Sequence, residues 1–315
     1  FYRLVQAPAI APAQQKAPTV PSWFSEMLPL SFDVAVNILK FRRYLEDLFV
    51  NKKSKAEVLR FIREYLYVDD DAAMAMYRYC REQYLYAKIP HDKRLLIEYY
   101  TNEEGKTYVI FHSLYGRRVN DCLSRALAYV IGRIQDRDVE IGINDNGFYL
   151  ASSKNIQASR ALDLLDPKDL RKVMEQAIEK TEVLKRRFRH CATRSLMILR
   201  EYKGKRKHVG RQQVSSMILL SAVKRISNEF SILKEARREV LNDLMDLDHA
   251  QQVIQDIQDG KIEVKQIHAS IPSPFAFNLI TQGHADIMRM EERMDFINRM
   301  HQMVLAKIGK THQSI

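Results

Sequence analysis

Apolar residues recur at steps of three and four along the first part of the chain, which is the spacing of one face of an α-helix. A first helix is predicted from about Ser31 onward. Further helices are predicted at 55–67 and 72–86, and three aspartates before the last of these suit the N-terminal end of its dipole. Residues 25–88 are therefore predicted to form a helical segment. The apolar face of the first helix is expected to contain Val34, Ile38, Phe41, Leu45 and Leu48.

After Pro90 the pattern changes to short runs that are rich in β-branched and aromatic residues. Two pairs of such runs flank turn sequences, and each pair predicts a β-hairpin. The second turn is Asn144-Asp145-Asn146-Gly147. With a helix predicted at about 120–135 between the hairpins, residues 89–155 are expected to form a compact ββ-α-ββ module. The predicted strands are 94–100 (RLLIEYY), 107–113 (TYVIFHS), 139–143 (VEIGI) and 148–151 (FYLA).

The rest of the chain has mostly helical periodicity. Pro167 after Asp166 suits a helix start. Residues 261–268 alternate like one half-buried strand or a wing. Leu196, Ile198 and Leu199 are expected to be buried. Helices are predicted at 168–185, at 212–226 with an apolar face of Val214, Met217, Ile218 and Ala222, and at 232–244, 249–259 and 283–304. The predicted fold class is α+β, mainly helical.

Proline-rich sequence precedes the first helix. Residues 7–21 hold four of the nine prolines, which fix φ and remove backbone donors, so an extended connector is predicted there. Residues 1–5 (FYRLV) have the pattern of a strand already under way, without an initiator methionine. The sequence is therefore expected to be a fragment of a longer protein.

Positive charge is concentrated in residues 185–211 (KRRFRHCATRSLMILREYKGKRKHVGR). This stretch holds eleven basic residues and one acid, Glu201, so its sum is 11 − 1 = +10, against +11 for the whole chain. Such dense charge repels itself, and its usual partner is a polyanion, most often nucleic acid. A solvated helix face is the alternative, but few acids lie nearby in the sequence. Phe188, His190 and Tyr202 lie among the cations and are candidates for stacking on unpaired bases.

Several protein classes lack their signatures. No apolar run of about 18 residues predicts a membrane span, and no signal-peptide pattern is present. The three cysteines are isolated, which favours a reducing cytoplasm. No phosphate-binding loop, metalloprotease or nucleophile-elbow motif occurs, so this chain is expected to contain no ATPase site, cofactor or catalytic residue of its own. Asp246, Asp248 and His249 are interpreted as a helix start in preference to a metal site.

Two smaller features are candidates for nucleic-acid contact. Arg117 and Arg118 follow Gly116 in a loop that feeds the predicted helix. Trp23, the only tryptophan, lies near the proline-rich connector and is either a stacking platform or a core anchor.

Several strings, taken in order, resemble a known family. They are PTVPSW with LPLS (18–23 and 28–31), FHSLYGRRVN (111–120), the 144–147 turn, FRHCA (188–192), LNDLMDLDHAQQVIQDIQDGKIEV (241–264) and SPF (273–275). The chain resembles the region after the motor in archaeal large helicase-related (Lhr) proteins of superfamily 2, including the DEAD/H-associated domain. The resemblance covers nearly the whole sequence.

The resemblance implies an ATP-dependent helicase that moves 3′ to 5′ on one strand, with a role in DNA repair. It also implies a β-barrel element, of which residues 1–24 would hold a remnant and the connector, and a basic, winged-helix-like region at 156–315. Both motor domains, which would hold ATP and Mg²⁺, lie outside this sequence. The family's post-motor domain contacts the tracking strand through a stacking tryptophan, and Trp23 is the candidate for that position.

The main hypothesis is therefore a non-catalytic, nucleic-acid-binding accessory domain of an Lhr-type helicase. Its partners would be single-stranded or forked DNA or an RNA–DNA hybrid, and the motor domains of the same protein. The alternative is a scaffold that docks on the motor or on another protein without touching nucleic acid. A nuclease or glycosylase activity ranks last because no paired carboxylates support it. The predicted nucleic-acid-binding residues are Trp23, Arg117, Arg118, Arg186, Arg187, Arg189, Lys203, Lys205, Arg206, Lys207 and Arg211.

Overall fold

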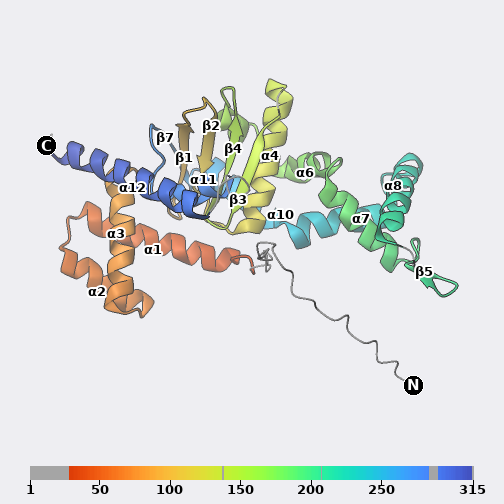
Figure 1. Cartoon of the computed structure of the whole chain (residues 1–315), viewed down its shortest axis with the longest axis horizontal. Helices are drawn as coiled ribbons and strands as arrows, with labels where there is room; N and C mark the ends of the chain where they lie inside the picture. The colour runs from red at the N-terminus through yellow and green to blue at the C-terminus, as the bar shows by residue number, and fades with distance from the viewer. Residues whose placement is uncertain (1–27, 137, 207, 284–289, 314–315) are drawn as a thin grey trace, which may run out of the picture.

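The computed structural model describes residues 28–136, 138–206, 208–283 and 290–313, and Figure 1 shows their arrangement. The predicted N-terminal helices are present as α1 (Phe32–Val50), α2 (Lys55–Leu66) and α3 (Asp70–Tyr86). Ser54 and Glu57 form a capping box at the start of α2, and Asp69 caps α3. The three helices share one apolar cluster around Leu45, Ile62 and Tyr77.

A five-stranded sheet of order β3-β4-β2-β1-β7 forms the centre of the molecule. The two predicted hairpins supply its four antiparallel strands, and α4 (Arg117–Gln135) connects them. The fifth strand, β7 (Glu263–Ala269), pairs in parallel with β1, from Arg94 opposite Glu263 to Tyr100 opposite Ala269. The strand at 261–268 was predicted, but its position in this sheet was not. The hairpin strands are β1 (Arg94–Thr101), β2 (Thr107–Phe111), β3 (Glu140–Asn144) and β4 (Gly147–Ser152).

Helices cover both faces of the sheet, so successive residues of its central strands are buried on opposite sides. Val109 and Phe111 of β2 belong to the large core that includes α4. Tyr108 and Ile110 face the other way, against α11 (Phe277–Gly283) and α12 (Met290–Gln313). The sequence of β2 is accordingly apolar at every buried position.

A buried carboxylate ties the segment after β7 to the sheet. Glu98 of β1 accepts hydrogen bonds from the Ser273 backbone N–H at 2.7 Å and from the Ser273 hydroxyl at 2.6 Å. The Nε2 atom of His112 lies 2.8 Å from the same carboxylate. All three residues are buried. Because the carboxylate lies between the histidine and the serine, the cluster lacks the nucleophile–base contact of a hydrolase and is a structural tether.

The remaining elements form a helical arm between β4 and β7. The single helix predicted at 168–185 is wrong: it is interrupted at 179–181, and Thr181 caps a new helix. The arm comprises α5 (Ala158–Asp163), η1 (Pro167–Asp169), α6 (Leu170–Ile178), α7 (Glu182–Arg194), β5 (Glu201–Tyr202), β6 (Lys205–Arg206), α8 (Val209–Ile226), α9 (Ser231–Arg238), the π-helical η2 (Glu239–Leu244) and α10 (Leu247–Gln258).

Two predictions about burial in this arm are also wrong. Of the three residues expected to be buried at 196–199, only Ile198 is, and Leu196 is 72% exposed. Helix α8 packs through Ser216, Leu220 and Val223, whereas Val214, Met217 and Ile218 of the expected apolar face point to solvent. Both errors arise because local periodicity finds an apolar stripe without identifying what covers it.

The predicted fold class, α+β and mainly helical, is confirmed. The proposed barrel remnant at residues 1–5 and the connector at 7–21 lie outside the described residues. The winged-helix-like character of the arm stays a prediction.

Candidate nucleic-acid interface

Helix α7, the β5–β6 hairpin and α8 carry most of the positive charge, and we call them together the basic lobe. Residues 182–226, which span it, contain thirteen lysines and arginines and two glutamates, a sum of 13 − 2 = +11. Figure 1 shows the basic lobe at one end of the long axis, away from the five-stranded sheet and opposite the C-terminal end. An anionic partner would therefore be attracted to this end of the molecule.

Helix α7 turns its apolar face inward and its arginines outward. The Thr181 hydroxyl accepts a hydrogen bond from the Leu184 backbone N–H at 3.4 Å, which fixes where the helix begins. The helical repeat then places Arg186 and Arg189 on the flank beside α8. The buried face consists of Leu184, Phe188, Cys191 and Ala192.

A groove of about 230 Å³ runs between α7 and α8. Within the described ranges, Arg186 and Arg189 have no acidic partner there, whereas Lys185 is paired with Glu182 at 2.7 Å. Two unpaired guanidinium groups beside neutral hydrogen-bonding side chains match the chemistry that binds phosphate oxygens. The complete lining is Glu182, Lys185, Arg186, Arg189, Gln213, Ser216, Met217 and Leu220.

The predicted basic loop is a short hairpin. Glu201 pairs with Arg206, and the turn residues Lys203 and Gly204 both have positive φ, 50° and 72°, as a type I′ turn requires. Lys205 and, at the start of α8, Arg211 are exposed. The side chains of Tyr202 and Arg206, and all of Lys207, lie outside the described part of the structure.

Not every predicted cation is available to a ligand. The guanidinium of Arg187 lies 3.5 Å from the buried carboxylate of Glu239, and Arg194 contacts the same carboxylate from its other side. Glu239 lies 52 residues after Arg187 and 45 residues after Arg194 in the sequence. It is therefore not among the acids near the basic stretch. Arg187 therefore joins α7 to η2.

The aromatic candidates of α7 differ in their surroundings. Phe188 is fully buried in the core, so the prediction that it stacks on bases is wrong. His190 is exposed. Partial burial, followed by the positive charges of Arg189 and Arg187, lowers the pKa of His190. The imidazole therefore lies in the positive field of these arginines.

Arg117 and Arg118 lie elsewhere, where α4 begins. The Oδ1 atom of Asp145 accepts hydrogen bonds from the backbone N–H groups of Arg117, at 2.8 Å, and Leu30, at 3.1 Å. The Arg117 side chain is exposed. The Arg118 guanidinium donates to the backbone carbonyls of Asn242, at 2.7 Å, and Met245, at 3.3 Å. Arg118 is thus engaged in holding η2 against α4.

The same junction explains two of the sequence motifs. Asn120 accepts a hydrogen bond from the Ser113 hydroxyl at 2.9 Å and donates one to the Asn144 carbonyl at 2.9 Å. Gly116 has φ +87°, and a Cβ there would lie 2.3 Å from the Leu30 carbonyl oxygen. The FHSLYGRRVN string and the 144–147 turn therefore meet Leu30, which lies just before the N-cap of α1, in one joint.

The structure thus divides the predicted site residues into two groups. Arg117 and Arg118 belong to the joint at the start of α4, and Lys207 is not among the described residues. The predicted residues in the basic lobe are Arg186, Arg187, Arg189, Lys203, Lys205, Arg206 and Arg211. Trp23 lies outside the described residues. Sequence reasoning missed Asp145, Glu239, Gln213 and Ser216, because each acts through contacts with distant elements.

Within the described ranges, no group of three or more potential ligand side chains could hold a metal ion. Asp246 is the N-cap of α10, and its Oδ2 atom lies 2.8 Å from the Nδ1 atom of His249. The trio of Asp246, Asp248 and His249 therefore stands at the start of a helix, as predicted. None of the described helices combines the length and apolarity needed to cross a membrane.

Two comparisons of sequence bear on the family. The DEAD/H associated family model matches residues 89–276. The ATP-dependent helicase Lhr-Core of Methanothermobacter thermautotrophicus is 53% identical over 293 residues, which cover 93% of this chain and 34% of that protein. The Lhr-Core of Saccharolobus solfataricus is 40% identical over 300 residues, with the same coverage of 93% and 34%. The chain thus spans about a third of the length of these curated relatives.

A solved structure shares the fold. The Mycobacterium smegmatis helicase Lhr bound to ssDNA and AMP-PNP matches 84% of this chain and 33% of its own, with a TM-score of 0.70 and 22% identity. The chain therefore belongs to the DEAD/H-associated family, and it resembles the Lhr helicases over the region that carries this family's domain.

Proposed function

We propose that the chain is a nucleic-acid-binding accessory domain of an ATP-dependent, 3′-to-5′ Lhr-type helicase, and that it guides the strand on which the motor moves. Its partners are single-stranded or forked DNA or an RNA–DNA hybrid, together with the motor domains of the same protein. ATP and Mg²⁺ bind in those motor domains, outside this sequence. The chain itself supplies binding and no catalysis.

The observation that carries the proposal is the groove between α7 and α8. Arg186 and Arg189 line it without acidic partners in the described structure, and Gln213 and Ser216 line it with neutral side chains that can form hydrogen bonds. Lys205 and Arg211 are exposed on the adjoining elements, so further phosphates of one strand can be neutralised along the basic lobe. The shared fold of a helicase solved with ssDNA supports the same assignment.

The test is a salt titration of binding to a labelled single-stranded DNA, followed by fluorescence anisotropy. The logarithm of affinity should fall linearly with the logarithm of salt concentration, with a slope of about −0.7 for each phosphate contacted. A forked DNA and an RNA–DNA hybrid should compete for the same site. An affinity that does not change with salt, or the absence of binding to single strands, would contradict the proposal.

A second function, docking of a protein partner, is favoured by the exposed face of α8. Val214, Met217 and Ile218 are 58%, 54% and 66% exposed and lie at i, i+3 and i+4. Arg211 and Arg225 lie at the two ends of this stripe, and α8 contains no acidic residue. An apolar stripe with cationic ends is complementary to an amphipathic helix with acidic flanks, which we propose as its occupant.

The variant Val214→Glu/Ile218→Glu distinguishes the two functions, because neither residue lines the groove between α7 and α8. It keeps all the cations of α8 but makes the stripe polar and acidic, so binding of a separately expressed Lhr motor region should be lost in a pull-down. The matched control Ser215→Glu/Ser221→Glu adds the same charge at exposed polar positions of α8. Equal losses of motor binding in both variants, or no loss in either, would contradict the docking proposal.

A further inference from the structure

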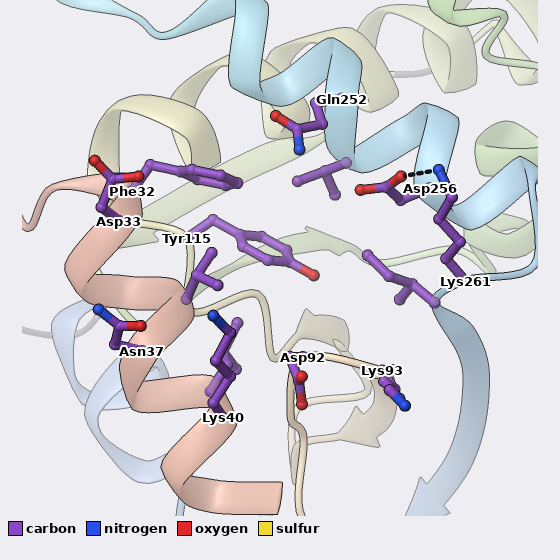
Figure 2. A pocket seen from close by; sticks show the side chains of 14 residues that line it. Phe32, Asp33, Asn37, Lys40, Asp92, Lys93, Tyr115, Gln252, Asp256 and Lys261 are labelled. Atoms are coloured by element: carbon purple, nitrogen blue, oxygen red, sulfur yellow. Dashed lines mark hydrogen bonds and ion pairs between the residues drawn. The ribbon is translucent and has the colours of Figure 1, made fainter.

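A second cavity, of about 460 Å³, lies far from the groove of the basic lobe. It is enclosed by α1, α10, the segment just before β1 and the residues that lead into β7 (Figure 2). Pockets of this size hold small organic ligands. It shares no lining residue with the groove between α7 and α8.

The cavity contains the hydroxyl of Tyr115, a residue that is itself almost entirely buried. Tyr115 is only 4% exposed, and no described group forms a hydrogen bond with its hydroxyl. Figure 2 shows this hydroxyl pointing into the cavity. Burial, and then the carboxylates of Asp256 and Asp92, raise the pKa of Tyr115, so the group stays protonated as a donor. The hydroxyl can therefore donate a hydrogen bond to a ligand atom in the cavity.

The side chain of Tyr115 is held in position by its neighbours. Its ring centroid lies 5.9 Å from that of Phe32, which in turn stacks on His249 at 4.1 Å. The residue directly precedes Gly116, whose backbone N–H donates to the Asp145 carbonyl at 3.3 Å. The hydroxyl is therefore presented by the rigid joint at the start of α4.

The unpaired charge that lines the cavity is mainly positive. Asp92 is paired with Arg43 at 2.8 Å, and Asp256 with Lys261 at 2.9 Å. Lys40 and Lys93 have no ion pair in the part of the chain that is described. Asp33 also lines the cavity, in the first turn of α1. In Figure 2, Lys40 reaches from α1 toward the ring of Tyr115, and the Tyr115 hydroxyl points away from α1. Lys40 and Lys93 can therefore attract an anionic group to the cavity, and the Tyr115 hydroxyl can donate a hydrogen bond to it.

The rest of the lining suits a flat body with a polar edge. Val36, Val253 and Ile262 are apolar. Gln252 and Asp256 face the cavity from α10, opposite Lys40 (Figure 2). Their oxygens accept hydrogen bonds from amino or imino groups, and the amide of Gln252 also donates.

We propose that this cavity binds a single nucleotide. Its phosphate is attracted by Lys40 and Lys93 and accepts a hydrogen bond from the Tyr115 hydroxyl, and its base lies on the apolar wall with its hydrogen-bonding edge toward α10. The nucleotide is either a free monophosphate or one unstacked residue of a bound strand, since both present the same phosphate, sugar and base. If the ligand is a free monophosphate, the proposal does not depend on strand binding by the basic lobe.

The test is isothermal titration of the chain with adenosine 5′-monophosphate and uridine 5′-monophosphate. At least one should bind saturably at one site, and the corresponding nucleoside should bind about tenfold more weakly because it lacks the phosphate. Tyr115→Phe, which removes only the hydroxyl, should weaken binding about fivefold, and Lys40→Ala should weaken it further. Tyr67→Phe, at a fully exposed tyrosine, is the matched control.

The two sources of the nucleotide are separated with a single-stranded oligonucleotide. If the cavity holds a residue of the strand, Tyr115→Phe also weakens oligonucleotide binding, and the oligonucleotide displaces the monophosphate. If it holds a free nucleotide, the monophosphate still binds when the oligonucleotide is saturating.

The double variant Arg186→Ala/Arg189→Ala should retain monophosphate binding. Loss of strand binding by the basic lobe and absence of nucleotide binding in the cavity therefore give different results. No saturable binding of either monophosphate would overturn the proposal. So would equal affinities for the wild-type chain and for both Tyr115→Phe and Lys40→Ala.

Discussion

Asp145 fixes the backbone of Arg117: one carboxylate oxygen accepts the Arg117 N–H at 2.8 Å and also that of Leu30 at 3.1 Å. One side chain in a hairpin turn thus determines where α4 begins and where the segment before α1 attaches. The sequence pattern placed the start of this helix at about residue 120, three residues too late, because the group that satisfies the first N–H comes from a turn 28 residues away.

Replacing this carboxylate should destabilise the protein. Asp145→Ala leaves two backbone donors without their acceptor, and the free energy of unfolding should fall by about 1–3 kcal/mol. Asp145→Asn keeps one carbonyl oxygen and should cost less. Urea denaturation measures both values. The exposed Asp138→Ala variant is the control, and an equal effect of Asp138→Ala and Asp145→Ala would contradict the role of the joint.

Glu46 should make stability depend on acid pH. Burial by itself would raise the pKa of Glu46, but hydrogen bonds from His91 and Arg94 outweigh burial and lower it below the ordinary 4.5. The unfolded chain therefore takes up a proton first as the pH falls. The contribution of Glu46 is complete above about pH 4.5 and is lost as the pH falls through its lower, folded-state pKa.

Urea denaturation between pH 3 and 6 (roughly the range in which carboxylates titrate) measures this contribution. Glu46→Gln should lower stability near pH 6 and flatten the acid dependence. The exposed Glu64→Gln variant should keep the wild-type slope. A wild-type slope in Glu46→Gln would show that another carboxylate is responsible.

The groove arginines should dominate the salt dependence of strand binding. In Arg186→Ala/Arg189→Ala, the slope of affinity against salt should become shallower by about 1.4, which corresponds to two phosphate contacts on a single strand. The exposed pair Arg60→Ala/Arg78→Ala, on α2 and α3, removes the same charge far from the basic lobe. Anisotropy titrations that give both variants the same slope would exclude a specific grip.

His190 should report occupancy of the basic lobe. Its pKa is lowered by partial burial and by Arg189 and Arg187, and a bound phosphate backbone would offset the effect of the arginines. The pKa of His190 should therefore rise when single-stranded DNA binds at low salt. A pH titration of its imidazole resonances by NMR checks this, with His268 on β7 as the distant reference. An unchanged or lowered value would place the strand elsewhere.

Local elements were predictable because their signals are local. Ser54 with Glu57 and the 144–147 turn mark element boundaries through contacts within a few residues. The two faces of α8 were confused because Val214, Met217 and Ile218 match helical spacing as well as Leu220 and Val223 do. Which stripe is buried depends on α7 and its other neighbours in space, and no local pattern contains that information.

The candidate site shows the same division. The density of cations around Arg186 and Arg189 was visible in the sequence, and it indicated an anionic partner. The partner of Arg187 was not, because Glu239 reaches it from another helix. The cavity around Tyr115 had no signal in the sequence at all, since its walls come from four separate parts of the chain.

The parallel pairing of β7 with β1 has a consequence for the continuity of the chain. Protease cleavage after Lys203 or Lys205, at the exposed tip of the hairpin, would leave β1 in one fragment and β7 in the other. The sheet, together with the buried contact of Ser273 with Glu98, would keep the two fragments in one particle. A nicked sample should thus elute as the intact molecule under native conditions and separate into two bands only when denatured.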